Sequence, residues 1–397
     1  MGERVWFWFR LLDGGADKAM MIGHISDTHL GVHAGVEPER EEDHYNAFKD
    51  AIDLFIRERV ELVIHSGDIL HEPKPYGTAM KVLIQEVRKL KGRGIPFLFT
   101  LGEHDISNVP STPHPIILQL QGLGRYIGTG EPYQVGGVTV IGLHKHKRVE
   151  WKSLIEKFEK IQRMLPNIGG KKVLVLHQGI KEAWELGAEL SIFELPAGFD
   201  YYAMGHIHKS YKRNWGSGLL AYPGATHWVK VDDSGECGVF IVDLSGDQAL
   251  AEWVRLPNVR PKLRLEVDVR ELDEKVKEIT GVDYPSKPCL WLVVKADRPV
   301  SVQSIEQRLS DKFIIKRLQV IPAPTEGKVY ASEPEISIDG ELRRLAVKAI
   351  GDEKVIDFAL NELLPRLASG DLVNAKEAVW KLWKSWPRDW AGSDSEG

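Results

Sequence analysis

The sequence is poor in cysteine and contains no long hydrophobic run. Its 397 residues include two cysteines, Cys237 and Cys289, which lie far apart in the chain. Two distant cysteines make no disulfide framework, and we predict that both are reduced and buried. No stretch approaches the roughly 18 apolar residues that a membrane-spanning helix requires. We therefore expect no membrane partner and a cytoplasmic location.

The sequence also lacks an excess of positive charge. The chain has 52 Lys and Arg against 57 Asp and Glu, so its formal net charge is −5. A protein that binds nucleic acid through its overall field is basic, so any such contact here needs local Lys/Arg patches or metal ions. The 43% of hydrophobic and 27% of charged residues are globular values. The length predicts one large domain and a smaller one.

The first 20 residues are expected to play no part in the chemistry. Residues 5–12 have the apolar character of a signal core, but the run is short, contains Arg10 and lacks a small-residue cleavage site. Met20 and Met21 directly precede the first predicted strand. We interpret residues 1–20 as an N-terminal appendage or the product of a misplaced start.

Asp, Glu and His gather in five short clusters, and each cluster follows an apolar run of strand length. Loops at the ends of strands can direct several ligands from a rigid sheet to one point. The available ligand atoms are oxygen and nitrogen, which suit Mn²⁺, Fe²⁺ or Zn²⁺ better than a structural thiolate zinc site. The clusters are Asp27-Thr28-His29, Ser66-Gly67-Asp68, Gly102-Glu103-His104-Asp105, Leu176-His177-Gln178 and Gly205-His206-Ile207-His208.

The order and spacing of these clusters resemble those of the calcineurin-like metallophosphoesterases. Within that superfamily the sequence is similar to the DNA double-strand-break repair nuclease branch, the SbcD-like nucleases. The resemblance covers about residues 21–230, and the remainder matches in layout. It implies an α/β fold, a four-layer α-β-β-α metallophosphoesterase sandwich with a small α+β capping domain and a helical C-terminal tail. The narrower motifs are Gly67-Asp68-Ile69-Leu70-His71, Leu176-His177-Gln178-Gly179, the run from Tyr201 to Lys209, and Tyr222-Pro223-Gly224-Ala225.

The resemblance also implies a ligand set for two Mn²⁺ ions per chain, and Fe²⁺ or Zn²⁺ would suit the same atoms. Asp68 is expected to bridge both ions, because a carboxylate has two oxygens. One ion is expected on Asp27, His29 and His208, and the other on Glu103, His177 and His206.

Two further histidines are expected to act on the substrate. His104 would stabilise the phosphate or protonate the leaving oxygen, and His71 resembles the histidine that supports exonuclease action. Asp105 stays open between a site residue and an acceptor for backbone N–H groups. The residues expected to contact DNA are Lys145, Lys147, Arg148 and Lys209.

Glu103 is the one clear departure from the family pattern, which has Asn at this position. A carboxylate that coordinated would add one negative charge to the site. A side chain that turned away would weaken the second metal site, and a tolerated Glu would change little. We favour coordination, because an unpaired carboxylate beside two divalent ions has no better partner.

Hydrophobic spacing predicts helices over residues 45–58, 77–91 and 115–122 and a strand over residues 61–65. His24 and His65 lie inside predicted strands, and we interpret them as core histidines. In the resembled family, two helices near 77–91 and 115–122 pair with their copies across a twofold axis. We therefore expect a homodimer, and ordinary core packing of these helices is the alternative.

The remainder of the chain is expected to form a second domain and a docking tail. Short helices after a linker bury little apolar surface and need a partner. The resemblance implies that this partner is an SMC-like ABC ATPase, and the chain has no phosphate loop of its own. The alternative is a helical pair that folds back on the capping domain. The expected segments are 1–20, an appendage; 21–257, the metallophosphoesterase nuclease domain; 258–322, a DNA-capping α+β domain; 323–340, a linker; 341–390, a helical ATPase-binding region; and 391–397, a disordered tail.

These features predict a Mn²⁺-dependent DNA nuclease that acts on DNA ends in double-strand-break repair. Double-strand exonuclease and single-strand endonuclease activities are both expected from the resemblance. One alternative is a DNA-end-binding scaffold with weakened nuclease activity, which the substitution at Glu103 would favour. The other is a metallophosphoesterase that acts on small phosphodiesters or on phosphoproteins. The predicted capping domain and tail argue against that reading, because a small substrate needs neither.

Overall fold

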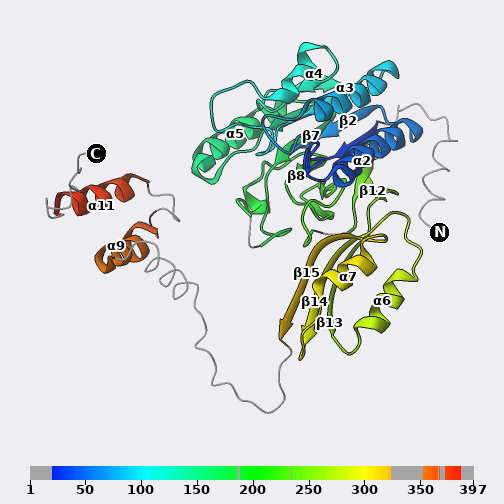
Figure 1. Cartoon of the computed structure of the whole chain (residues 1–397). Coiled ribbons are helices and arrows are strands. Elements are labelled where there is room, and N and C mark those ends of the chain that lie inside the picture. Colours follow the sequence, from blue (N-terminus) through cyan, green and yellow to red (C-terminus); the bar gives the residue numbers. More distant parts are fainter. Residues whose placement is uncertain are drawn as a thin grey trace. The chain divides into compact units, whose positions relative to one another are not determined.

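The structure is a computed structural model (Figure 1). It describes residues 20–185, 188–233, 235–322, 352–364, 366 and 372–385. The chain divides into two compact units, Met1–Pro322 and Ala323–Gly397. The expected linker and the expected disordered tail lie outside the described residues, as does the N-terminal appendage except for Met20.

The first sheet of the larger unit has six strands in the order β12-β11-β1-β2-β3-β4. The strands β1 to β4 run parallel, and β11 is antiparallel to both β1 and β12. Parallel neighbours place their carboxyl ends at one edge of the sheet. The strands are β1 (Met21–Ile25), β2 (Leu62–His65), β3 (Phe97–Phe99), β4 (Arg125–Tyr126), β11 (Gly238–Asp243) and β12 (Leu250–Arg255).

Helices α2 (Pro38–Arg57) and α3 (Gly77–Gly92) cover the outer face of this sheet (Figure 1). Pro38 begins α2, where its missing N–H costs nothing, and acidic residues in the first turn complement the helix dipole. Tyr45, Phe48, Ile52 and Phe55 recur at helical spacing and are fully buried. This apolar stripe fixes α2 on the sheet.

The second sheet also has six strands, in the order β5-β6-β7-β8-β10-β9. Its inner strands β6, β7, β8 and β10 are parallel. Helix α5 (Trp151–Met164) buries Leu154, Phe158 and Ile161 against the outer face. The strands are β5 (Tyr133–Val135), β6 (Val138–Leu143), β7 (Lys171–His177), β8 (Tyr201–Gly205), β9 (Tyr211–Trp215) and β10 (Gly218–Tyr222).

The two sheets pack face to face around an apolar core. Ile22 and Ile64 of the first sheet and Val140 and Val175 of the second are fully buried in one cluster. With helices outside both sheets, the expected four-layer α-β-β-α sandwich is confirmed. His24 lies in this core, where its Nδ1 is 2.7 Å from Tyr201 Oη.

The predicted helix over residues 115–122 is shorter than expected. A 3₁₀ turn η1 (His114–Ile116) leads into α4 (Ile117–Leu120), and the chain then turns through Gly122 at a φ of 61°. A positive φ at a glycine is a common way to end a helix. Among the described residues, no helix combines the length and the apolarity needed to cross a bilayer.

Residues 262–322, which we call the β13–β15 unit, form a three-stranded sheet with two helices on it (Figure 1). All three strands are parallel, in the order β13-β14-β15. Parallel neighbours need crossover connections, and the two helices supply them. The expected α+β unit therefore has the alternating order of an α/β unit. Its elements are β13 (Lys262–Asp268), α6 (Leu272–Thr280), β14 (Cys289–Ala296), α7 (Val302–Leu309) and β15 (Ile314–Pro322).

Arg260, just before the β13–β15 unit, bonds both to the carbonyl of Lys287 inside the unit, at 2.5 Å, and to the sandwich. The Arg260 guanidinium binds both oxygens of Asp43 on α2, at 2.5 and 2.8 Å. Trp228 Nε1 donates to the carbonyl of Arg260 at 2.7 Å. Cys237 and Cys289 pack with Trp228 in one small cluster, and both cysteines are buried and outside any disulfide, as predicted.

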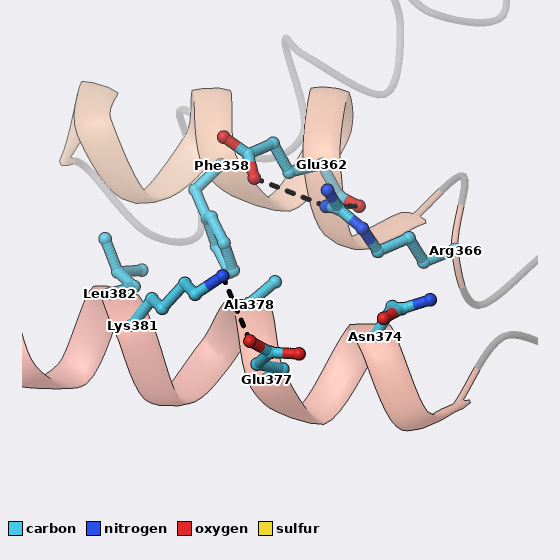
Figure 2. A pocket seen from close by; sticks show the side chains of 8 residues that line it. All are labelled: Phe358, Glu362, Arg366, Asn374, Glu377, Ala378, Lys381 and Leu382. Atoms are coloured by element: carbon cyan, nitrogen blue, oxygen red, sulfur yellow. Dashed lines mark hydrogen bonds and ion pairs between the residues drawn. The ribbon is translucent and has the colours of Figure 1, made fainter.

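The smaller unit contains α9 (Glu353–Phe358), which continues into a π-helical turn η5 (Ala359–Leu363), and α11 (Leu372–Ser385). Figure 2 shows the cleft between these helices, with the Glu362–Arg366 and Glu377–Lys381 ion pairs on its rim. On α11, Trp380 is 58% exposed and Trp383 67%. The helical spacing predicted for this segment is therefore present in its described part.

Candidate metal centre

The five ligand-type clusters meet where the carboxyl ends of the parallel strands of the two sheets face each other. Asp27, Asp68 and Glu103 follow β1, β2 and β3, while His177 ends β7 and His206 follows β8. Backbone hydrogen bonds join the loops. The N–H of His206 donates to Asp27 Oδ2 at 3.1 Å, and that of His104 donates to Asp68 Oδ1 at 2.9 Å.

Four of the expected ligands have a strained backbone. The φ angles are 52° at Asp27, 44° at His29, 53° at Asp68 and 96° at His206. A residue with a Cβ in this region costs on the order of 1–3 kcal/mol. These four are among six such residues in the described part of the chain. The concentration of strained residues in this one cluster indicates that the direction of their side chains is maintained at a cost in local stability.

Two glycines leave the space that these side chains occupy. A Cβ on Gly102 would lie 2.0 Å from Asp68 Oδ1. A Cβ on Gly67 would lie 2.4 Å from His177 Nδ1, and Gly67 also has a φ of 100°. Glycine is therefore required at both positions for the carboxylate and the imidazole to approach each other.

The first group of facing atoms belongs to Asp27, His29 and His208. Their candidate ligand atoms lie within 4.8 Å of one another. His29 Nε2 is 3.1 Å from His208 Nε2, and the latter is 3.9 Å from Asp27 Oδ1. Asp27 and His29 are almost completely buried. Two imidazole nitrogens at this separation repel unless a cation or a proton lies between them.

The second group belongs to Glu103, His177 and His206. Glu103 Oε1 is 3.0 Å from His206 Nδ1, and its Oε2 is 3.2 Å from His177 Nε2. Asp68 Oδ2 lies between the groups, 3.3 Å from His177 Nε2 and 3.8 Å from His29 Nε2. The Glu103 side chain thus points into the cluster and does not turn away.

The residues fit divalent cations. Glu103 Oε2 and His177 Nε2 are buried and have no hydrogen-bond partner. His177 Nδ1 donates to the Ser66 carbonyl at 2.7 Å, which leaves the Nε2 lone pair for a metal. Burial lowers the pKa of His177, but Asp68 and Glu103 raise it well above its ordinary value. The Asp68 and Glu103 carboxylates therefore favour a positive charge at His177, and a bound divalent cation would provide that charge.

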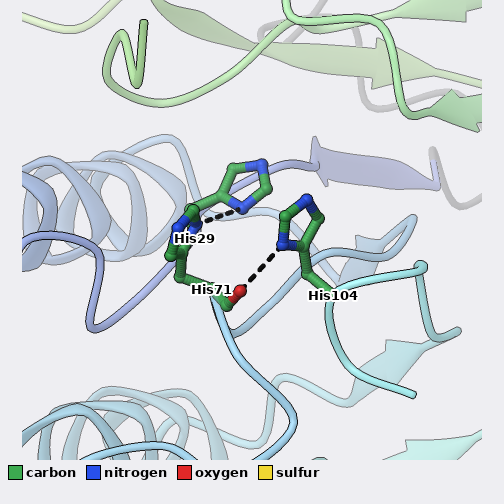
Figure 3. Close-up of side chains that lie close together, drawn as sticks. All are labelled: His29, His71 and His104. Carbon is green, nitrogen blue, oxygen red and sulfur yellow. Dashed lines mark hydrogen bonds between the residues drawn. The ribbon is translucent and has the colours of Figure 1, made fainter. Parts of the chain in front are cut away.

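His71 and His104 flank His29, with ring centroids 5.3 and 4.8 Å from that of His29 (Figure 3). The His104 and His71 rings stack at 5.0 Å. His104 Nδ1 donates to the His71 carbonyl at 2.7 Å, so its Nε2 stays free. Burial and the neighbouring His104 lower the pKa of His71 to about 4, so His71 is neutral at pH 7.

Lys145 is buried and does not face solvent, contrary to its expected contact with DNA. Its Nζ lies 2.5 Å from Glu189 Oε1, 3.3 Å from His206 Nε2 and 3.8 Å from Glu103 Oε2. The side chain is 6% exposed. The basic run is therefore split, because the chain turns Lys145 inward before Lys147. Lys145 is therefore not available for contact with DNA.

The other expected DNA contacts are exposed. Lys147, Arg148 and Lys209 all lie on the surface. Lys147 Nζ donates to Asn108 Oδ1 at 2.5 Å, on the loop that follows the Glu103 cluster. These three cations are available to a phosphate backbone.

Asp105 lies outside both ligand groups. Its carboxylate accepts hydrogen bonds from the N–H groups of Leu70 at 2.9 Å, Gly102 at 3.0 Å and Ile69 at 3.2 Å. It thereby ties the loop after β2 to the loop after β3. Of the two roles left open for Asp105, the structure supports the backbone acceptor.

Two acidic residues beside the cluster were not identified from the sequence. Glu189 pairs with Lys145, and Asp233 Oδ2 lies 3.1 Å from His208 Nδ1. Burial raises the pKa of Asp233, but the His208 side chain and two backbone N–H groups hold it at about 2. Neither residue follows a strand that leads to the site. No spacing rule could therefore have marked them.

Over residues 20–247 the chain matches the calcineurin-like phosphoesterase superfamily domain. This match spans more than half of the chain and includes every residue of the two ligand groups. The chain therefore belongs to the calcineurin-like phosphoesterase superfamily, as the strand-end clusters predicted.

Comparison with curated proteins gives a narrower family. The chain is 29% identical to the DNA double-strand break repair protein Mre11 of Thermoplasma acidophilum, over 85% of this chain and 92% of that protein. For the protein of the same name from Saccharolobus solfataricus the identity is 28%, over 70% and 76%. For that of Sulfurisphaera tokodaii it is 30%, over 69% and 73%. Within the superfamily the chain belongs to the Mre11 family.

Proposed function

We propose that the chain is a Mn²⁺-dependent DNA nuclease that processes DNA ends in double-strand-break repair. The observation that carries this proposal is the convergence of seven Asp, Glu and His side chains at one edge of the sandwich. The names of the relatives supply the biological setting, since they are DNA double-strand break repair proteins. Double-strand exonuclease and single-strand endonuclease activities are both part of the proposal.

The expected ligand set is retained in this proposal. One ion would be held by Asp27, His29 and His208, and the second by Glu103, His177 and His206. Asp68 would contact both, since its Oδ2 lies between His29 and His177. Bound divalent ions supply charge neutralisation for the phosphodiester and a hydroxide nucleophile at neutral pH. General acid–base chemistry alone gives about 10²–10⁴-fold, far less than phosphodiester cleavage needs.

Glu103 is proposed to coordinate the second ion. Its two oxygens face His206 Nδ1 and His177 Nε2. Burial raises the pKa of the Glu103 carboxyl, yet these two histidines hold it well below its usual range. Lys145, 3.8 Å away, offsets the negative charge that a Glu brings to this position. The inward direction of Glu103 and the nearby Lys145 ammonium favour an active nuclease over a DNA-end-binding scaffold.

His104 is proposed to act on the phosphate. The His71 carbonyl accepts from its Nδ1–H, so Nε2 is the atom left for the substrate, and in the imidazolium form it donates to a phosphate oxygen or to the leaving oxygen. His71 stacks on the His104 ring and contacts His29 Nδ1 at 3.4 Å. We assign His71 a supporting role in exonuclease action.

The DNA backbone is proposed to contact Lys147, Arg148 and Lys209, which are exposed cations near the cluster. We further propose that residues 258–322 cap the DNA. This unit lies against the same sandwich, where Arg260 binds Asp43. Because the chain as a whole is negatively charged, the proposal assigns DNA affinity to these local cations.

Two protein partners complete the proposal. The helical region 341–390 would bind an SMC-like ABC ATPase, and the exposed Trp380 and Trp383 rings on α11 are suited to such a contact. A homodimer would form through α3 and α4, where Leu120 is 74% exposed. The buried residues of α3 pack in the core, so only its outer face is available to a second copy.

A cleavage assay on linear double-stranded DNA tests the proposal. Cleavage should require Mn²⁺, should stop in excess EDTA, and should be lost in Asp68→Asn. The matched control is Asp53→Asn on α2, whose side chain is 60% exposed and which should cleave normally. Activity on a small phosphodiester alone would favour a general phosphodiesterase. End binding without cleavage would favour the scaffold, and cleavage in excess EDTA would contradict the metal site.

A further inference from the structure

Asp233 accepts a hydrogen bond from the His208 ring nitrogen that does not face Asp27 and His29. Its Oδ2 accepts from His208 Nδ1 at 3.1 Å and also from the N–H groups of Val229 and Lys230, each at 2.8 Å. The chain from Val229 to Asp233 thus wraps around its own carboxylate. With Nδ1 donating to Asp233, the Nε2 of His208 faces Asp27 and His29. A histidine held in this way has its tautomer and ring direction fixed.

Lys262 donates hydrogen bonds to the backbone of the same turn. It is the first residue of β13, and its Nζ donates to the carbonyl of Val231 at 2.7 Å and to that of Asp233. The ammonium also lies 5.2 Å from the Trp228 ring. One side chain of the β13–β15 unit therefore binds the backbone of the residue whose side chain orients His208.

We propose that Asp233 and Lys262 are a positioning pair that ties the orientation of His208 to the seating of the β13–β15 unit on the sandwich. When the unit is seated, Lys262 fixes the turn, and the turn fixes the imidazole. A displacement of the unit from the sandwich withdraws the ammonium and frees His208 to rotate. The metal site is then complete only when the unit is in place. This inference rests on the proposed role of His208 as a metal ligand.

A neighbouring ion pair provides a matched control. Arg264 lies two residues further along β13, and its Nη1 is 3.0 Å from Asp232 Oδ1, one residue before Asp233. Both side chains are more than three-quarters exposed. This pair joins the same strand to the same turn, but it touches neither Asp233 nor His208. If these contacts only stabilised the turn, losing either Arg264 or Lys262 would have the same effect. If Lys262 positions His208, only the loss of Lys262 affects metal binding.

The experiment is calorimetric titration of the metal-free full-length protein with Mn²⁺. Lys262→Met keeps the apolar stem beside Trp228 and removes the ammonium. We expect one of the two ions to bind about tenfold more weakly, the lower end of the range found when the direct partner of a metal-ligating residue is removed, because Lys262 acts through Asp233. The second ion should bind as in the wild type, Lys262→Arg should recover part of the affinity, and Arg264→Met should match the wild type.

A second variant keeps the test decisive if Lys262→Met is unstable. Asp233→Asn preserves shape and should weaken the same ion, and melting temperatures show whether each variant is folded. Wild-type affinity in folded Lys262→Met, or an equal loss in Arg264→Met, overturns the inference. His208→Ala separates this failure from that of the proposed function. If His208→Ala binds two ions as tightly as the wild type, the ligand assignment itself is wrong.

Discussion

Replacement of Lys145 by Met tests the charge balance of the metal centre. Lys145 is the buried cation that faces Glu189, Glu103 and His206. Met fills a similar volume without the ammonium. The variant leaves two carboxylates on one side of the cluster without their shared counter-charge.

The expected cost follows from the distances. At an effective dielectric constant of about 20, unit charges 3.8 Å apart interact by roughly 4 kcal/mol, and the 2.5 Å pair with Glu189 is stronger. The desolvation of Lys145 cancels part of this, and loss of one partner of a buried pair costs about 3–5 kcal/mol. Glu189 and Glu103 are 18% and 32% exposed, so we expect the lower end, about 3 kcal/mol, in the metal-free protein.

Bound Mn²⁺ should offset this loss of stability. A divalent cation neutralises the same carboxylates, so Lys145→Met should bind Mn²⁺ at least about tenfold more tightly than the wild type. Its melting temperature should accordingly rise more on addition of Mn²⁺. The assay is a set of melting curves over a Mn²⁺ series, with calorimetry for the affinity.

Lys147→Met is the control for this experiment. Lys147 lies two residues away but is exposed and bound to Asn108. It should leave the Mn²⁺ affinity unchanged and weaken DNA binding. If Lys145→Met binds Mn²⁺ no more tightly than Lys147→Met, the ammonium does not balance the site and the reasoning is refuted.

Three further predictions concern single side chains. Glu103→Asn should weaken Mn²⁺ binding at the second site, measured by calorimetry, with equal or faster cleavage at saturating Mn²⁺, because the ion loses a negative ligand. His104→Ala should lose about 10²–10⁴-fold of the cleavage rate while elemental analysis still finds both ions. Burial lowers the pKa of His24 from 6.5 to about 3, so neutral His24 favours the folded state. That stability is complete above pH 6.5 and is lost as pH falls toward 3. In His24→Gln, the melting temperature should therefore fall less over this range.

Each of these predictions has a clear contrary result. Tighter Mn²⁺ binding in Glu103→Asn would mean that Glu103 is not a ligand. Loss of an ion from His104→Ala would make His104 a ligand and not a group that acts on phosphate. An equal fall of the melting temperature in His24→Gln and wild type would show that His24 does not contribute to acid sensitivity.

The sequence predicted the features that depend on local pattern. A strand followed by Asp27, Asp68 or His177 is visible in the chain, and parallel strands bring such ends to one edge. The inward direction of Lys145 was not predictable, because it depends on Glu189, which lies 44 residues away. The link from Lys262 to Asp233 likewise joins the β13–β15 unit to the sandwich through backbone carbonyls, which leave no trace in residue spacing.

The central claim is that seven side chains hold two divalent ions. Anomalous diffraction from crystals grown with Mn²⁺ tests it most directly. We expect two peaks about 3.5–4 Å apart, both beside Asp68. One should lie among Asp27, His29 and His208, and the other among Glu103, His177 and His206. No peak at these residues, or a second peak from which the Glu103 carboxylate has turned away, would contradict the account.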